Sequence, residues 1–264
     1  MDTFRDRTDA GEQLGEQMRY LRHDDVVVMG LPRGGVPVAA EVAKILDAPI
    51  DVVIVRKLGV PHQPEVAMGA IGEGGLRVLE QQIVAHAGVS EMEVGRVEQI
   101  ERRVLDERVC LVRKGRARVD VTGRTVVVVD DGIATGATAR VACRVVRSWG
   151  ASRVVLATPV GPRDVLEHFD DADEVVCIMA PTDFRAVGKY YADFEPTSDD
   201  TVIALLREAD TRMSNRSGPE SATLSFDADV EIPVGDVVPM GNLRPVEDVR
   251  GNCGIRPRQR KQPS

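Results

Sequence analysis

Apolar runs alternate with amphipathic segments along most of the chain. Five runs rich in Val and Ile have the length of strands, and near-continuous runs of this kind are typical of parallel strands that are covered on both faces. Helical patterns separate them. This alternation predicts an α/β protein with an open, doubly wound, mainly parallel sheet. The predicted strands are Val26–Leu31, Val52–Arg56, Thr125–Asp130, Val154–Pro159 and Glu174–Met179, and the predicted helices cover about 8–22, 36–46, 90–113, 137–149, 162–169 and 199–209.

The most informative segment begins at the third predicted strand. Residues 125–138 read Thr-Val-Val-Val-Val-Asp-Asp-Gly-Ile-Ala-Thr-Gly-Ala-Thr, which is a strand, two acids and a loop of small residues before a helix. Unpaired N–H groups at the start of a helix form an anion site, so the loop is predicted to hold a phosphate. Asp130 and Asp131 suit a sugar diol or a sugar-bound metal, and a phosphate beside a diol indicates a ribose 5-phosphate. The loop residues are Gly132, Ile133, Ala134, Thr135, Gly136, Ala137 and Thr138.

Two common phosphate-binding motifs do not fit this segment. Ala137 stands where a Walker A loop needs lysine, and no Gly-x-Gly-x-x-Gly follows a strand as in a dinucleotide fingerprint. The plain alternative is a buried parallel strand whose end happens to carry acids. The agreement of loop, acids and following helix favours the phosphate site.

The segment closely resembles the phosphoribosyl-diphosphate (PRPP) site of the type I phosphoribosyltransferases. The resemblance implies the fold of that family, with a small hood and a flexible loop beside the sheet. It also implies that the loop at 132–138 binds the 5-phosphate of PRPP and that Asp130 and Asp131 face the ribose hydroxyls. Mg²⁺ is the implied cofactor, and the two acids are expected to hold it through metal-bound water.

Two further loops extend the resemblance. The segment Gly30-Leu-Pro-Arg-Gly-Gly-Val36 ends the first predicted strand and opens a helix, at the place where the family holds pyrophosphate. A pyrophosphate is therefore expected on the backbone amides at 34–36, those of Gly34 and Gly35 among them. Arg33 would add charge-assisted hydrogen bonds.

Arg56 and Lys57 stand at the carboxyl end of the second predicted strand. The resemblance makes them pyrophosphate-binding residues, and it makes the stretch over Gly59, Pro61 and Pro64 a flexible loop that folds over PRPP. The alternative for a basic pair after a strand is a solvated surface. The catalytic residues that the resemblance implies are Asp130, Asp131, Lys57 and Arg33.

The acceptor half of the site is less well specified. Its candidate hood is the segment 181–194, together with the N-terminal Phe4–Arg7. Phe184, Tyr190 and Tyr191 are the candidates to stack on an acceptor base. Aromatic residues in such a stretch belong to the core about as often.

Composition limits the partners. The chain has 264 residues, of which 43% are hydrophobic and 29% charged, enough for a sizeable core. A formal net charge of −8 counts against nucleic acid, and 3% aromatic residues count against stacking platforms for single strands. No apolar stretch approaches a membrane span and the first residues are charged, so a cytoplasmic location and no membrane partner are expected. A homodimer is a further expectation.

Residues 1–210 are predicted to form the phosphoribosyltransferase domain, and 211–264 a linker and a poorly structured tail. Within the tail, 224–250 weakly resembles the first strands of an α/β-hydrolase of the dienelactone-hydrolase kind. No Gly-x-Ser-x-Gly follows it. A nondescript tail is the alternative.

The implied activity is transfer of the phosphoribosyl group from PRPP to a nitrogenous base or amine, with release of pyrophosphate, in nucleotide metabolism. Family members that use 6-oxopurines carry aspartate at the position of Ala134, so alanine argues against hypoxanthine and guanine as acceptors. The alternative function is a non-catalytic PRPP or nucleotide sensor with the same fold. A third interpretation treats the tail as the remnant of a hydrolase fusion.

Overall fold

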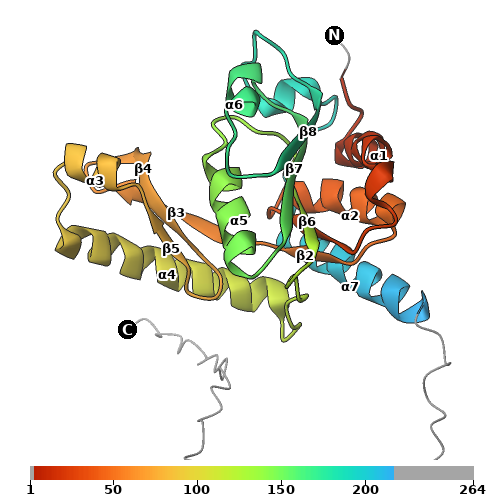
Figure 1. Ribbon diagram of the computed structural model, residues 1–264, viewed down its shortest axis with the longest axis horizontal. Coiled ribbons are helices and arrows are strands. Elements are labelled where there is room, and N and C mark those ends of the chain that lie inside the picture. Colours follow the sequence, from red (N-terminus) through yellow and green to blue (C-terminus); the bar gives the residue numbers. More distant parts are fainter. Residues whose placement is uncertain (1–2, 217–264) are drawn as a thin grey trace, which may run out of the picture. The chain divides into compact units, whose positions relative to one another are not determined.

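A parallel sheet of five strands forms the centre of the described part of the chain. The computed structural model describes residues 3–216 (Figure 1). The strands run in the order β2-β1-β6-β7-β8 and each is parallel to its neighbours, so the predicted doubly wound sheet is confirmed. Their bounds are β1 Val26–Gly30, β2 Ile50–Val52, β6 Thr125–Val129, β7 Arg153–Val160 and β8 Glu174–Met179.

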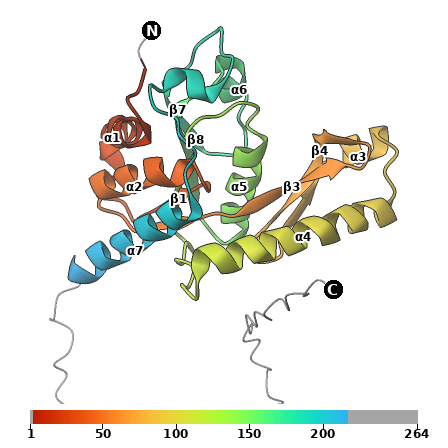
Figure 2. The ribbon, with the colours of Figure 1, turned by 180° about the vertical axis from the view of Figure 1, so that it is seen from behind.

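Alternate residues of these strands enter two separate cores. Val26 and Val28 of β1 pack toward one face of the sheet, whereas Val27 and Met29 pack toward the other, as the two-residue period of a strand requires. Helices α1, α2 and α7 cover the first face, and α5 and α6 lie on the second (Figures 1 and 2). The helices are α1 Arg7–Gln17, α2 Gly35–Leu46, α5 Ala137–Ser148, α6 Arg163–Glu167 and α7 Asp199–Arg216, with 3-10 turns η1 Arg19–Leu21 and η2 Val187–Tyr190.

A second sheet, which is antiparallel, belongs to a part of the chain that we call the arm, residues 55–113. Its strands run in the order β3-β4-β5, and the long helix α4 packs along β3 (Figure 2). A capping box starts α4, because Ser90 and Glu93 each accept a hydrogen bond from the other's backbone N–H. The bounds are β3 Val55–Val60, β4 Gln63–Gly72, β5 Arg77–Leu79, α3 Gln81–His86 and α4 Glu91–Arg113.

The strand predicted at 52–56 is two strands in the structure. β2 ends at Val52, and β3 begins at Val55 in the other sheet. Val53 and Ile54 between them are both buried, so the apolar run continues through the break. Hydrophobic pattern therefore does not reveal the change of sheet at this point.

The segment expected as a flexible loop forms the end of the β3–β4 hairpin instead. Val60 pairs with Gln63 across this end. The backbone of Gly59 lies so close to Pro64 that a Cβ atom on Gly59 would be 2.6 Å from the Pro64 carbonyl oxygen. Glycine here permits close contact of two strands, a role that the sequence pattern does not distinguish from a loop.

Helix α7 continues beyond its predicted end near residue 209 and includes Arg216, so the first residues of the predicted linker are helical. Arg212 anchors the added length by donating a hydrogen bond of 2.9 Å to the Ala48 carbonyl oxygen. Residues 217–264, with most of the predicted tail and the hydrolase-like segment, lie outside the described residues. Among the helices of residues 3–216, none has the length and apolarity needed to cross a membrane.

A buried charge network joins the arm to the central sheet. Asp51 of β2 is 0% exposed and accepts hydrogen bonds from Arg116 Nη1 at 2.6 Å and from Arg113 Nη1 at 3.2 Å. Arg113 also pairs with Glu73 after β4, and Arg116 pairs with Asp210 of α7. A buried carboxylate requires such partners, so Asp51 fixes the end of α4 against β2 and α7.

Asp51→Asn is predicted to lower the free energy of unfolding by roughly 3–5 kcal/mol, because it leaves two arginines beside an uncharged buried group. Thermal and urea denaturation measure the change. Asp25→Asn is the control, since Asp25 is an exposed partner of Arg124 and such pairs contribute about 1 kcal/mol or less. Equal stability of the two variants would contradict the role assigned to Asp51.

Candidate functional site

The two predicted acids lie beside the predicted pyrophosphate loop, at the carboxyl edge of the central sheet. Asp130 and Asp131 follow β6, and the loop at 31–34 follows the adjacent strand β1. A Cβ atom on Gly34 would lie 1.9 Å from Asp131 Oδ2, and one on Gly35 would lie 2.6 Å from the Val129 carbonyl oxygen. Only glycine at these two positions lets the loop rest against the acids.

The predicted phosphate loop is hydrogen-bonded to the sheet at one point and is exposed around the start of α5. The buried Ile133 donates its N–H to the Val160 carbonyl oxygen at 2.9 Å, which fastens the loop to β7. Gly136 has a φ of 74°, in the left-handed region that favours glycine, and it caps the start of α5. Ala134, Thr135 and Thr138 are exposed around that helix start. The arrangement is that of an anion site on a helix N-terminus.

The two acids have different surroundings. Asp131 is paired with Arg7, whose Nε donates to Oδ2 at 2.8 Å. Within residues 3–216, Asp130 accepts a hydrogen bond only from the Asp131 N–H, at 2.9 Å, and it has no ion pair. Burial raises the pKa of Asp130 well above its usual value, and the neighbouring Asp131 charge raises it further. Burial also raises the pKa of Asp131, against the lowering effect of Arg7. Asp130 is thus a carboxylate in need of a cation or of hydroxyl donors.

Arg7 is the residue of this site that sequence reasoning did not single out. The sequence motifs indicate Arg7 only as the last residue of the N-terminal part of the candidate hood. In the structure its Nη1 donates to the Glu195 carbonyl oxygen at 2.7 Å, and its guanidinium lies 4.0 Å from the ring centroid of Phe194. No local sequence signal connects Arg7 with Asp131, because the contact joins segments that are far apart in the chain.

The predicted hood is a packed cluster rather than an open pocket. Tyr191 is only 6% exposed, packs against Phe4, and donates its hydroxyl to the Asp131 carbonyl oxygen at 2.5 Å. The ring therefore presents little exposed surface on which an acceptor could stack. Phe184 and Tyr190 are half-buried and stack on each other, with centroids 5.8 Å apart. The alternative that these aromatic residues are core fits Tyr191 best.

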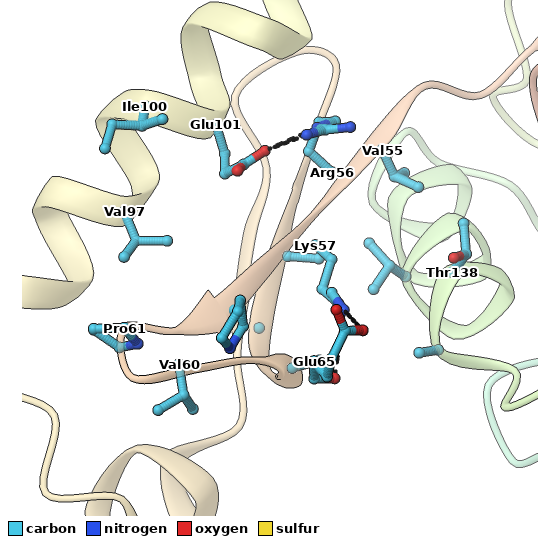
Figure 3. Close-up of a pocket in the computed structure, with 17 residues that line it drawn as sticks. Val55, Arg56, Lys57, Val60, Pro61, Glu65, Val97, Ile100, Glu101 and Thr138 are labelled. Carbon is cyan, nitrogen blue, oxygen red and sulfur yellow. Dashed lines mark hydrogen bonds and ion pairs between the residues drawn. The ribbon is translucent and has the colours of Figure 1, made fainter.

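The predicted basic pair lines a cavity of about 530 Å³ between the arm and the start of α5 (Figure 3). Arg56 pairs with Glu101 of α4 at 2.7 Å, and Lys57 pairs with Glu65 at 3.5 Å. Thr138 of the phosphate loop lines the same cavity. The pair and the phosphate loop therefore face one space, and each cation has a carboxylate neighbour that the sequence motifs did not reveal.

A smaller cavity of about 310 Å³ extends this space toward the pyrophosphate loop. It shares Arg56 and Thr138 with the larger cavity and reaches Leu31 and Pro32. Arg33 follows in the same loop, is exposed, and has no ion pair within residues 3–216. Three segments that are far apart in the sequence thus meet around two adjoining cavities.

One detail of the pyrophosphate loop differs from expectation. The N–H of Gly35 donates to the Leu31 carbonyl oxygen at 3.0 Å, and that of Val36 donates to the Arg33 carbonyl oxygen at 3.2 Å. Two of the three amides expected to hold pyrophosphate are therefore used within the loop. The peptide bond between Pro32 and Arg33 is cis.

The carboxylate oxygens available at this edge fit a Mg²⁺ ion that is coordinated mainly by water. Across residues 3–216, no group of three or more His, Cys, Asp or Glu side chains gathers as a ready-made metal site. Asp130 and Asp131 supply carboxylate oxygens, and Mg²⁺ commonly keeps several waters while it binds one or two carboxylates. The unpaired carboxylate of Asp130 is the better placed of the two.

Comparison with known proteins agrees with this arrangement. A model of the phosphoribosyl transferase domain matches residues 8–195. Two Mycobacterium tuberculosis proteins, from strains CDC 1551 / Oshkosh and ATCC 25618 / H37Rv, are provisionally named phosphoribosyl transferases. Each is 48% identical over 254 residues, which are 95% of this chain and 57% of the relative. The chain therefore spans little more than half the length of these relatives.

A solved structure has the same architecture. The crystal structure of TT1426 from Thermus thermophilus is 44% identical in sequence and superimposes with a TM-score of 0.72, over 79% of this chain and 99% of that chain. The matched domain model covers both acids and all three loops of the site. This chain belongs to the phosphoribosyl transferase domain family.

Proposed function

We propose that the chain transfers the 5-phosphoribosyl group of PRPP to a nitrogenous base or amine and releases pyrophosphate. The observation that carries the proposal is the meeting of three loops at one edge of the sheet. The helix start at Thr138 and the basic pair line adjoining cavities, and the two acids follow β6 beside the pyrophosphate loop, whose Leu31 and Pro32 line the smaller cavity. Family membership supports the same chemistry.

Each part of PRPP has a matching group. The 5-phosphate would bind the helix start at 134–138, where exposed hydroxyls add to the backbone amides. The ribose hydroxyls would donate to Asp130 and Asp131. Arg33 and Lys57, with Arg56, would hold the pyrophosphate through charge-assisted hydrogen bonds. Bound Mg²⁺ would neutralise part of the phosphate charge.

The reaction breaks the bond between the anomeric carbon and the pyrophosphate oxygen, and the electron pair leaves with pyrophosphate. Positive charge develops on the ribose ring, so the nearby carboxylate of Asp130 favours the transition state. The acceptor nitrogen then forms the new bond from the opposite face of the ring, and its proton passes to the departing pyrophosphate or to water. The phosphate loop holds the reacting carbon in place, which lowers the entropy cost of the encounter.

The carboxylates that pair with Arg56 and Lys57 would be replaced by pyrophosphate when PRPP binds. Glu101 and Glu65 balance the two cations, and the Lys57 pair is long, at 3.5 Å, and exposed. A pyrophosphate carries more charge than one carboxylate and would take over these donors. Release of the two glutamates accompanies binding in this proposal.

The proposal is tested by following pyrophosphate release from PRPP and Mg²⁺ with a panel of acceptors: adenine, uracil, hypoxanthine, guanine, ammonia and aromatic amines. Release with adenine, uracil or an amine, and little with hypoxanthine or guanine, is expected from alanine at position 134. PRPP binding without release by any acceptor would favour a sensor over a transferase. Absence of PRPP binding by the folded protein would contradict the proposal itself.

Asp130→Asn is predicted to raise the melting temperature at neutral pH by about 2–4 °C and to weaken PRPP binding roughly ten- to a hundredfold. The raised pKa of Asp130 means that the folded state holds this proton to higher pH than the unfolded state. Stability is therefore lost as pH rises from 3.8 through the folded-state pKa, and asparagine removes that loss. Melting curves from about pH 4 to about pH 8 should show the gain only at the higher pH values. A variant that melts lower than wild type at neutral pH would contradict this account.

Lys57→Ala is expected to weaken PRPP binding by roughly tenfold while leaving ribose 5-phosphate binding unchanged, because only PRPP carries the pyrophosphate. Calorimetric titration of both ligands with Mg²⁺ measures the difference. Lys44→Ala is the control, since Lys44 lies on α2 and pairs with Glu41. Equal weakening of both ligands by Lys57→Ala would remove this residue from the pyrophosphate site.

A further inference from the structure

The start of α1 is fixed to the hood by backbone pairing. Phe4 donates its N–H to the Tyr190 carbonyl oxygen at 2.9 Å and accepts from the Ala192 N–H at 2.8 Å. The Asp193 N–H then donates to the Arg5 carbonyl oxygen at 2.8 Å. Figures 1 and 2 show α1 beside β7 and β8, near this segment. Arg7, the first residue of α1, thus follows a segment that is fixed by backbone hydrogen bonds.

Arg7 reaches Asp131 from the end of that segment. Its Nε donates to Asp131, its Nη1 donates to the Glu195 carbonyl oxygen, and its planar guanidinium lies against the ring of Phe194. The side chains of Arg7 and Asp131 are only 12% and 15% exposed. Planarity, several donors and ring stacking are properties of arginine that lysine does not share.

Asp131 is consequently held on several sides. Oδ2 accepts from Arg7, the backbone oxygen accepts from Tyr191, and Gly34 lies against the carboxylate. Within residues 3–216, Arg7 is the side chain that pairs with this carboxylate, and it does so through Oδ2 and not through Oδ1. One oxygen of Asp131 therefore has a set direction and remains available, next to the carboxylate of Asp130.

We propose that Arg7 is a positioning residue that orients Asp131, so that the two acids together recognise the ribose diol. The inference rests on the proposed function, because the diol belongs to the PRPP site. A carboxylate that is already oriented loses less conformational freedom when a hydroxyl donates to it, so binding is stronger. Arg7 thereby sets the preference for a ribose ligand over one that lacks a hydroxyl.

The contrary interpretation is that Arg7 blocks Asp131 and must leave before a ligand binds. The two interpretations predict opposite signs when Arg7 is replaced. Loss of a positioning residue weakens ribose binding, whereas loss of a blocking residue strengthens it. The stacking and the second hydrogen bond of Arg7 favour the positioning role, since a group that must leave would lose all three contacts at once.

The test compares ribose 5-phosphate with 2-deoxyribose 5-phosphate, each with Mg²⁺, by ligand-observed NMR titration. Wild type is expected to prefer ribose 5-phosphate, and Arg7→Gln to reduce that preference by roughly tenfold. Arg7→Lys should recover part of it, because charge remains while the planar fork is lost. Arg19→Gln is the control, since Arg19 is exposed and pairs with Glu16. Binding of 2-deoxyribose 5-phosphate shows that each variant is folded.

A double-mutant cycle shows whether Arg7 acts through Asp131. In an Asp131→Asn background, Arg7→Gln should change ribose affinity little, because its target is already altered. An unchanged ribose preference in Arg7→Gln, or tighter ribose binding, would overturn the inference alone. If wild type binds both sugars equally, the result contradicts the proposed ribose diol site itself rather than the role of Arg7. If Arg7→Gln does not fold, Arg7→Lys takes its place with a smaller expected loss of ribose preference, and no loss in Arg7→Lys would overturn the inference.

Discussion

The partial burial of two adjacent carboxylates at the carboxyl end of β6 is the constraint on which the rest of the site depends. Two negative charges in a poorly solvated place repel each other and need compensation. Arg7 supplies it for Asp131, and the glycines of the pyrophosphate loop allow that loop to lie against the acids. Within the described residues Asp130 is left without a cation, and for this reason we propose that a metal-bound sugar binds at this edge.

The arm contributes the opposite charge at the same edge. Arg56 and Lys57 stand on β3, whose sheet is attached to the central sheet through the short link after β2 and through the network around Asp51. Because that network is buried, the arm's basic pair is held at a defined position relative to the phosphate loop. In the proposed function, the stability of this junction and the recognition of pyrophosphate are therefore linked.

The sequence predicts the structure best where the residues that define a feature are close together in the chain. The strands of the central sheet and the run at 125–138 were visible because β-branched residues, acids and glycines occur in a fixed order within a few residues. The change of sheet between Val52 and Val55 was not visible, because apolar residues continue through it. The burial of Tyr191 was equally hidden, since an aromatic residue in a polar stretch fits a core and a pocket alike.

Contacts between distant segments set the limit of such reasoning. Arg7 and Asp131 are joined by tertiary packing, and neither residue has a neighbour in sequence that indicates the other. The same holds for Glu101, which faces Arg56 from another element of the arm. The motifs thus supplied the groups that are proposed to contact the ligand, and the fold revealed the groups that hold them in place.

The most direct test of the central claim is a crystal structure of the protein with Mg²⁺ and PRPP. The account predicts the 5-phosphate at the start of α5, the ribose hydroxyls within hydrogen-bond distance of Asp130, and the pyrophosphate directed toward Arg33 and Lys57. PRPP bound with its ribose away from both acids, or bound at another face of the domain, would contradict it.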